Sequence, residues 1–305
     1  MLSRFWLGLQ HNSGRYMYLS INYRPAALLP ELITIPSTVQ KLHANFDLNN
    51  LFKLDTATRL ANKGYAVYGI DYEGHGESSG QQGYIPSFDD LVKDCSDYFI
   101  SVCERQENKE KSRFLLGVSM GGAVVILLHR REPNYWSGAI LLAPLCKIDD
   151  KMKPPAFLIS ILKKLSKIIP TWKVIPAKDM IDVAIKSPEK RQEVRSNPYC
   201  YKGNLPLRTG HELLMVSLDI EKNLHQVSLP FLVMHGGDDK IIDPSGSQLL
   251  YNSASSSDKT LKLYPGMWHG LTFGEPPEIV ERFFSDMVAW LDQRTCMKDQ
   301  DIISS

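Results

Sequence analysis

The stretch that most constrains this chain lies at residues 114–125 and reads FLLGVSMGGAVV. It starts as an apolar run typical of a buried strand, continues as G-x-S-x-G, and ends in an apolar segment of helical length. This order predicts a nucleophile elbow, in which a strand turns sharply into a helix with a serine at the turn. We therefore expect Ser119 to be a nucleophile.

The same turn explains the glycines and gives the serine a chemical setting. The residue at the turn takes a strained backbone conformation, and Gly117 and Gly121 let the strand and the helix approach closely. Because Ser119 would lie at a helix N-terminus, the backbone N–H of Met120 is expected to face a developing oxyanion. The alternative is a chance G-x-S-x-G in a loop, which the flanking strand and helix patterns disfavour.

Strand and helix patterns alternate on both sides of the elbow. Continuous apolar runs are typical of a mostly parallel sheet with helices on both faces, so the fold class is α/β. The predicted strands are 15–23, 65–71, 114–116, 138–143, 229–235 and 260–264, with a short one at 31–35 that Pro36 ends. The predicted helices are 54–63, 88–103, 123–128, 244–253 and 277–293, and the tail from Lys298 is expected to fray.

The alternation stops in the middle of the chain. Between Lys147 and Gln226 prolines separate short helical pieces, and no clear buried strand is present. We predict residues 1–146 as the N-terminal part of the core, 147–226 as a helical lid insertion and 227–305 as the C-terminal part of the core. A length of 305 residues suits one large α/β domain with such an insertion.

Composition excludes several classes of protein. A net charge of +1 gives no reason to expect a nucleic-acid partner, and no apolar run approaches the roughly 20 residues of a membrane span. Five cysteines without a C-x-x-C pair predict reduced thiols in a cytoplasmic protein, not a disulfide framework or a metal site. The region before Glu31 has arginines and no acid, as transit peptides do, but residues 16–23 favour a strand of the folded domain.

A serine nucleophile needs a base, and His269 is the best candidate. It lies in PGMWHG at 265–270, directly after the strand that ends at Tyr264, and α/β sheets place their sites at this end of their strands. His235 is the nearest rival, but it ends its own strand and is more typical of a packed or hydrogen-bonded histidine. The remaining alternative is that His269 is an ordinary surface-loop histidine.

The orienting acid is expected between nucleophile and base along the chain. The segment GGDDK at 236–240 follows a buried strand, and the spacing from Gly236 favours Asp239 over Asp238. Asp243 is a third candidate, better suited to cap the helix that begins after it. In this scheme the serine attacks, the histidine takes and returns the proton, and Asp239 holds the imidazole tautomer.

Four motifs together are more specific than any one of them. They are GIDYEGHG at 69–76, GVSMGG at 117–122, HGGDDK at 235–240 and YPGMWHG at 264–270. On these motifs the chain resembles the monoacylglycerol lipase-type branch of the α/β-hydrolase fold, especially its plant caffeoylshikimate esterase-like members. The resemblance implies a serine carboxylic ester hydrolase with a helical lid and no cofactor. The implied substrate is a small acyl ester: a monoacylglycerol, a lysophospholipid or a hydroxycinnamoyl (caffeoyl) ester.

The chain departs from that family near its N-terminus. Family members carry a His-Gly-aromatic-Gly loop whose backbone N–H supplies half of the oxyanion hole, but no His-Gly occurs between Met1 and Leu54. Pro36 has no N–H, so the second donor would be Ser37 or Thr38, or would be absent. Loss of one donor costs about 100- to 1,000-fold in turnover. The alternative functions are a non-catalytic ligand-binding protein and an acyltransferase with the same triad. A mis-assembled gene model is the alternative explanation of the missing loop.

The insertion also differs from the core in charge. Residues 147–226 carry a net charge of +6, against −5 for the remainder. The segment AFLISILKKLSKII at 156–169 is apolar with interleaved lysines, so we expect it to contact a membrane surface or line an acyl tunnel. The alternative is an ordinary cap helix packed on the core, with the lysines on its solvated face.

Overall fold

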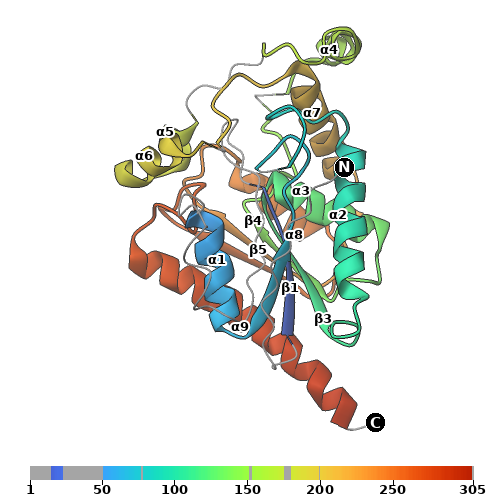
Figure 1. The fold of residues 1–305 in the computed structure, drawn as a ribbon, viewed down its shortest axis with the longest axis vertical. Coiled ribbons are helices and arrows are strands. Elements are labelled where there is room, and N and C mark those ends of the chain that lie inside the picture. Colours follow the sequence, from blue (N-terminus) through green and yellow to red (C-terminus); the bar gives the residue numbers. More distant parts are fainter. Residues whose placement is uncertain are drawn as a thin grey trace.

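The computed structural model describes residues 15–22, 51–76, 78–150, 153–174, 180–198 and 200–303. These residues form one sheet of six strands in the order β2-β1-β3-β4-β5-β6, and every neighbouring pair is parallel (Figure 1). The predicted α/β class is therefore confirmed. The strands are β1 (Arg15–Asn22), β2 (Tyr65–Gly69), β3 (Ser112–Ser119), β4 (Gly138–Leu142), β5 (Phe231–Gly236) and β6 (Lys259–Tyr264).

Helices cover both faces of this sheet, because its central strands are apolar on both sides. Leu115 packs with one set of helices and the next residue, Leu116, packs with the other, as the alternation of side chains along a strand requires. The first face carries α2 (Phe88–Cys103), α3 (Met120–Arg131) and α8 (Pro244–Ser253), and the second carries α1 (Leu51–Asn62) and α9 (Pro277–Ile303).

Local signals set most element boundaries. Ser87 caps α2 by accepting a hydrogen bond from the Asp90 N–H at 3.2 Å, and Asp243 caps α8 in the same way. α9 extends beyond its predicted end at Gln293, because residues 294–303 contain neither glycine nor proline to stop it. The strand predicted at 31–35 lies outside the described residues.

The insertion between β4 and β5 contributes four α-helices and one 3-10 turn among the described residues. They are α4 (Ala156–Ile168), α5 (Ile181–Ala184), α6 (Pro188–Ser196), α7 (Leu207–Lys222) and η1 (Leu224–Gln226). All lie within the predicted bounds 147–226, and the division into core and lid stays a prediction. In Figure 1, α4 lies farthest from the sheet, whereas α5 and α6 lie together at the left.

Parallel pairing decides where the polar motifs meet. The carboxyl ends of β3, β5 and β6 lie at one edge of the sheet, because all neighbouring strands run the same way. Ser119 ends β3, residues 237–240 follow β5 and residues 265–270 follow β6. The three candidate groups therefore converge on one edge, as is usual for ligand sites in α/β sheets.

Candidate active site

Ser119 has the strained backbone expected of an elbow. Its φ of 54° and ψ of −117° lie in a region that residues with a side chain rarely adopt. A Cβ atom on Gly117 would lie 2.3 Å from the carbonyl oxygen of Gly121, and one on Gly122 would lie 2.5 Å from Pro144 Cβ. The glycines are therefore required by the close approach of strand, helix and the segment after β4.

The elbow places Ser119 directly before the first turn of α3. Met120 is the first residue of that helix and is buried. Helix geometry leaves its backbone N–H without an intrahelical carbonyl partner and at the positive end of the helix dipole. An oxyanion formed at Ser119 would therefore have one donor provided by the fold.

Asp239 and His269 are in direct contact at the ends of β5 and β6. His269 Nδ1–H donates to Asp239 Oδ2 at 2.5 Å, and both side chains are buried. Asp238, the competing candidate, is exposed, and Asp243 is occupied in capping α8. The geometry thus agrees with the choice of Asp239 as partner of His269.

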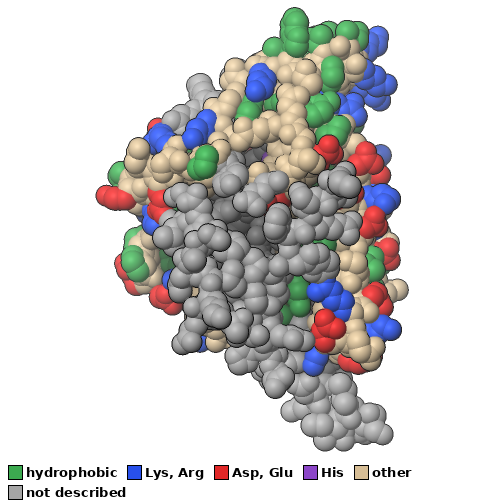
Figure 2. All heavy atoms as spheres, in the orientation of Figure 1, with side chains coloured by type: hydrophobic (Ala, Val, Ile, Leu, Met, Phe, Trp, Pro, Cys, Tyr) green, Lys and Arg blue, Asp and Glu red, His purple; other side chains and the backbone are tan. Residues whose placement is uncertain are grey.

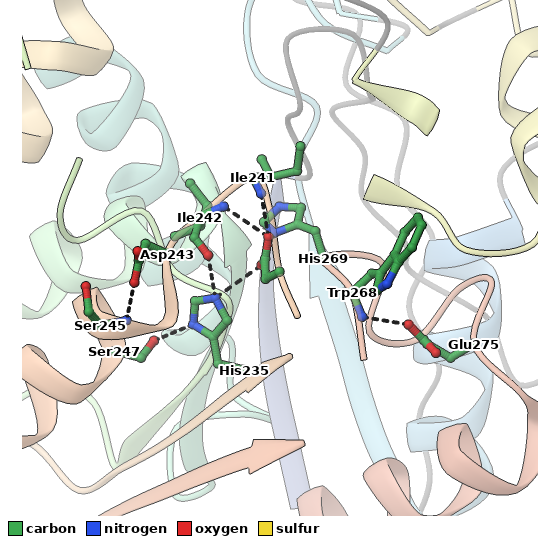
Figure 3. Close-up of polar contacts among 10 residues, drawn as sticks. His235, Ile241, Ile242, Asp243, Ser245, Ser247, Trp268, His269 and Glu275 are labelled. Carbon is green, nitrogen blue, oxygen red and sulfur yellow. Dashed lines mark hydrogen bonds and ion pairs between the residues drawn. The ribbon is translucent and has the colours of Figure 1, made fainter. Parts of the chain in front are cut away.

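Backbone and side-chain donors surround the Asp239 carboxylate (Figure 3). Oδ1 accepts from the N–H groups of Ile241 at 2.7 Å and Ile242 at 3.0 Å, and Oδ2 also lies 3.1 Å from His235 Nε2. Burial raises the pKa of this carboxyl, but the charge of His269 and hydrogen bonds from both histidines outweigh it and hold the pKa well below its usual value. Asp239 is therefore ionised at neutral pH and suited to stabilise an imidazolium.

The loop that carries His269 is held from both sides. The Trp268 N–H donates to Glu275 Oε1 at 2.7 Å, and the Glu275 side chain is only 1% exposed (Figure 3). The Gly270 N–H donates to the carbonyl of Ala184 in the insertion at 2.8 Å. The imidazole is thus positioned by its neighbours in the chain as well as by Asp239.

Sequence reasoning missed two of these groups. His235 is buried and hydrogen-bonded, as predicted, but its contact with the same carboxylate as His269 was not anticipated. The available signal was its spacing of four residues from Asp239 across a turn that reverses the chain. Glu275 had only a weak signal, a lone acid in a Gly-Glu-Pro-Pro turn shortly after His269.

On the oxyanion side of the elbow, the described residues belong to β1. The strand beside β3 at the elbow is β1, and Asn22 pairs in register with Ser119. The residues after Asn22, including the strand predicted at 31–35, lie outside the described residues until residue 51. The candidate donors Ser37 and Thr38 lie outside the described residues and stay predictions.

No group of three or more His, Cys, Asp or Glu side chains among the described residues is arranged to hold a metal ion. What the site presents is a strained serine before a helix and, at the same edge of the sheet, a buried carboxylate–histidine pair after two neighbouring strands. On a parallel sheet, this combination defines a serine hydrolase with the α/β-hydrolase fold.

Comparison with known proteins gives the family. The model of the Hydrolase_4 family, described as serine aminopeptidase S33, matches residues 51–277, and the chain belongs to this family. Caffeoylshikimate esterase of Arabidopsis thaliana is 38% identical over 232 residues, which are 76% of this chain and 70% of that protein. Monoglyceride lipase of Homo sapiens is 31% identical over 231 residues, 75% of this chain and 74% of that protein.

Solved structures agree with this assignment. The crystal structure of Paleococcus ferrophilus monoacylglycerol lipase has a TM-score of 0.74 at 22% identity and covers 96% of this chain and 99% of its own. A soluble variant of Saccharomyces cerevisiae monoglyceride lipase, in complex with a substrate analog, has a TM-score of 0.74 at 21% identity and covers 97% and 94%. These findings confirm the fold and the resemblance seen in the motifs, and the chain is a hydrolase of the same type as these proteins.

Proposed function

We propose that this chain hydrolyses a carboxylic ester through an acyl-enzyme on Ser119. The observation that carries the proposal is the buried His269–Asp239 hydrogen bond at the same sheet edge as the strained serine. Ser119 Oγ attacks the ester carbonyl while His269 takes its proton, and the Met120 N–H stabilises the oxyanion. His269 then protonates the leaving alcohol, and a water molecule, activated by the same imidazole, releases the acid.

For the substrate we propose a monoacylglycerol, a lysophospholipid or a hydroxycinnamoyl ester. Support comes from relatives named caffeoylshikimate esterase and monoglyceride lipase, which the chain resembles over most of its length. These substrates share an ester between an extended apolar or aromatic acyl group and a polar alcohol. Such substrates suit a site at a sheet edge that lies below an insertion rich in apolar side chains.

A catalytically weak hydrolase is the second candidate, and one observation favours it. The family's His-Gly oxyanion loop has no counterpart between Met1 and Leu54. With a single donor from Met120, acylation would be slower by about 100- to 1,000-fold. A protein of this kind would still react with a fluorophosphonate at Ser119 but would turn over esters slowly.

The triad is tested by four variants assayed with p-nitrophenyl esters. Ser119→Ala, His269→Ala and Asp239→Asn should each lower kcat by about 10⁴-fold or more, and their effects should not add, because the three groups act as a unit. Asp238→Asn is the matched control and should stay near wild type, since Asp238 is exposed. An active Asp239→Asn variant beside an inactive Asp238→Asn variant would show that the acid was wrongly chosen.

Fluorophosphonate labelling separates the two candidate functions. A working hydrolase should label stoichiometrically at Ser119 and turn over p-nitrophenyl acetate at a rate on the order of 10 per second. Stoichiometric labelling with turnover lower by the factor of a missing oxyanion donor would identify the weak hydrolase. Absence of labelling in folded protein would refute both.

We further propose that α4 contacts a membrane surface. Its apolar side chains point outward: Phe157 is 68% exposed, Ile161 46% and Ile168 75%, and Ser166 is the one buried residue of the helix. Figure 2 shows this apolar patch at the top of the molecule with basic side chains beside it. No described helix is both long and apolar enough to cross a bilayer. Apolar and basic side chains together favour the interface of an anionic membrane over packing on the core.

We propose a cytoplasmic location, peripheral to membranes. The four cysteines whose side chains the structure describes, Cys95, Cys103, Cys146 and Cys200, are all free and buried. Free thiols in the core suit a reducing compartment.

A further inference from the structure

A second histidine shares the carboxylate that orients His269. His235 is the penultimate residue of β5 and is completely buried. Its Nε2 lies 3.1 Å from Asp239 Oδ2 and 2.9 Å from the carbonyl oxygen of Ile242, and its Nδ1 lies 2.7 Å from Ser247 Oγ (Figure 3). Its polar contacts therefore lead to the acid of the proposed triad, to the turn after β5 and to α8.

These contacts fix the tautomer of His235. Nε2 faces two acceptors, a carboxylate and a backbone carbonyl, so it carries the proton and donates to both. Nδ1 is then the acceptor, and the buried Ser247 hydroxyl donates to it. A neutral imidazole satisfies every group in this arrangement, which is what a buried histidine requires.

The carboxylate is correspondingly fixed in rotation. Two backbone N–H groups hold Oδ1, and two histidines hold Oδ2, His235 from β5 and His269 from the loop after β6. Turning the carboxyl about its Cβ–Cγ bond would break all four hydrogen bonds. The oxygen that faces His269 is therefore selected by the turn after β5 and by His235 together.

We propose that His235 is a positioning residue for the reaction: its Nε2–H orients the Asp239 carboxylate and takes a share of the negative charge on Oδ2. This inference rests on the proposed ester hydrolysis. Without the Nε2–H donor, more of the charge on Oδ2 acts on His269, because a hydrogen bond to an anion lowers the attraction that the anion exerts elsewhere. His269 would then hold its proton more tightly and serve as a base only at higher pH.

Other charged groups near the pair stay in place when His235 is changed. Asp243 at the start of α8 interacts electrostatically with His235 and also with Lys147, which follows β4. These groups, with Asp239 and His269, are the charges that bear on the pH profile. A variant that alters only the donor at position 235 leaves all of them unchanged.

The test uses substitutions at position 235 that differ in which neighbouring groups the new side chain can contact. His235→Gln can place an amide N–H near the position of Nε2, whereas His235→Asn can reach Ser247 but not Asp239. His235→Leu fills the site without a donor and excludes water from it. His225→Gln, at an exposed histidine of η1, is the matched control.

The measurement is kcat/KM against pH for a p-nitrophenyl ester, with active sites counted by fluorophosphonate titration so that misfolded protein does not contribute. We expect His235→Asn and His235→Leu to lower kcat by about tenfold and to move the acid limb up by about 0.5 pH unit. His235→Gln should restore most of the wild-type profile, and His225→Gln should not change it. A merely structural role would lower the number of titrated sites without moving the acid limb.

Two negative results are distinguishable. An active wild type whose Asn and Leu variants keep the wild-type acid limb and kcat per titrated site would overturn the inference alone. A folded wild type that neither hydrolyses esters nor reacts with the fluorophosphonate would overturn the proposed function, and the inference with it.

Discussion

Two parts of the insertion, α4 and residues 180–198, pack against the rest of the molecule in opposite ways. α4 presents large apolar side chains to solvent and buries only Ser166. Residues 180–198, which contain α5 and α6 and are called here the anchored segment, bury theirs in the core cluster on the α1 and α9 face of the sheet. These buried residues are Ile181, Ala184, Ile185 and Val194.

Hydrogen bonds attach the anchored segment to the loop that carries His269. The Gly270 N–H donates to the Ala184 carbonyl at 2.8 Å, and the Ser187 N–H donates to the Gly274 carbonyl at 3.1 Å. Lys186 Nζ donates to the Gly266 carbonyl at 3.1 Å. The anchored segment is therefore part of the structure that positions the base, whereas α4 is a surface element. The two segments of the predicted lid therefore have different structural roles.

The largest expected effect is a difference in the free energy of unfolding between substitutions in the anchored segment and in α4. Ile185 is 1% exposed and Ile168 is 75% exposed, so the same substitution can be made in each part. Ile185→Asp should lower the free energy of unfolding by more than about 3 kcal/mol, because it buries an unpaired carboxylate. Ile168→Asp should change it by less than about 0.5 kcal/mol. Urea unfolding of the two variants measures the difference, and equal losses would contradict the division.

A smaller effect is expected where the anchored segment meets the base loop. Glu275→Ala removes the acceptor of the Trp268 N–H next to His269 and should lower kcat about tenfold, since a loosened loop misplaces the imidazole. Glu275→Gln keeps an acceptor oxygen and should retain most of kcat. Glu278→Ala is the control: Glu278 is a nearby acid whose side chain is exposed, so we expect less than a twofold change. Steady-state kinetics that show no loss for Glu275→Ala would remove Glu275 from the positioning machinery.

The same contrast shows what the sequence can reveal. The elbow, the cap at Ser87 and the acid turn at 236–240 depend on residues that are neighbours in the chain, so their patterns predicted them. The periodicity of 156–169 predicted a helix, but not which of its faces is covered, because that depends on distant elements. The contact of His235 with Asp239 likewise depends on how the turn after β5 folds back.

The oxyanion side was harder still. The elbow fixes Met120 locally, but a second donor must come from a chain segment next to β3 in space. Sheet order places β1 beside β3, with Asn22 in register with Ser119, and no motif in the sequence indicated this pairing. The order of strands in a sheet depends on the whole fold, so a local motif does not predict it.

The smallest expected effect concerns α4 and a membrane. Ile161→Ser with Ile168→Ser removes two exposed apolar side chains without changing the charge. Burying one such side chain fully is worth about 1.5–3 kcal/mol, and a surface helix buries it only in part. The double variant should therefore bind anionic phospholipid vesicles about tenfold more weakly, while its kcat for a water-soluble acetate ester stays at the wild-type value. Vesicle co-sedimentation and the acetate assay measure the two quantities.

The control for this experiment lies in the anchored segment. Val183 on α5 is 36% exposed, comparable to Leu158 on α4 at 37%, but the other apolar residues of its segment, such as Ile181 and Ala184, are buried against the core. Val183→Ser should leave vesicle binding unchanged, because an isolated apolar side chain on a fixed segment cannot enter the headgroup region with its neighbours. If Val183→Ser weakened binding as much as the α4 double variant, the membrane would contact the whole insertion, and the contrast between its two parts would hold for stability and catalysis but not for the surface.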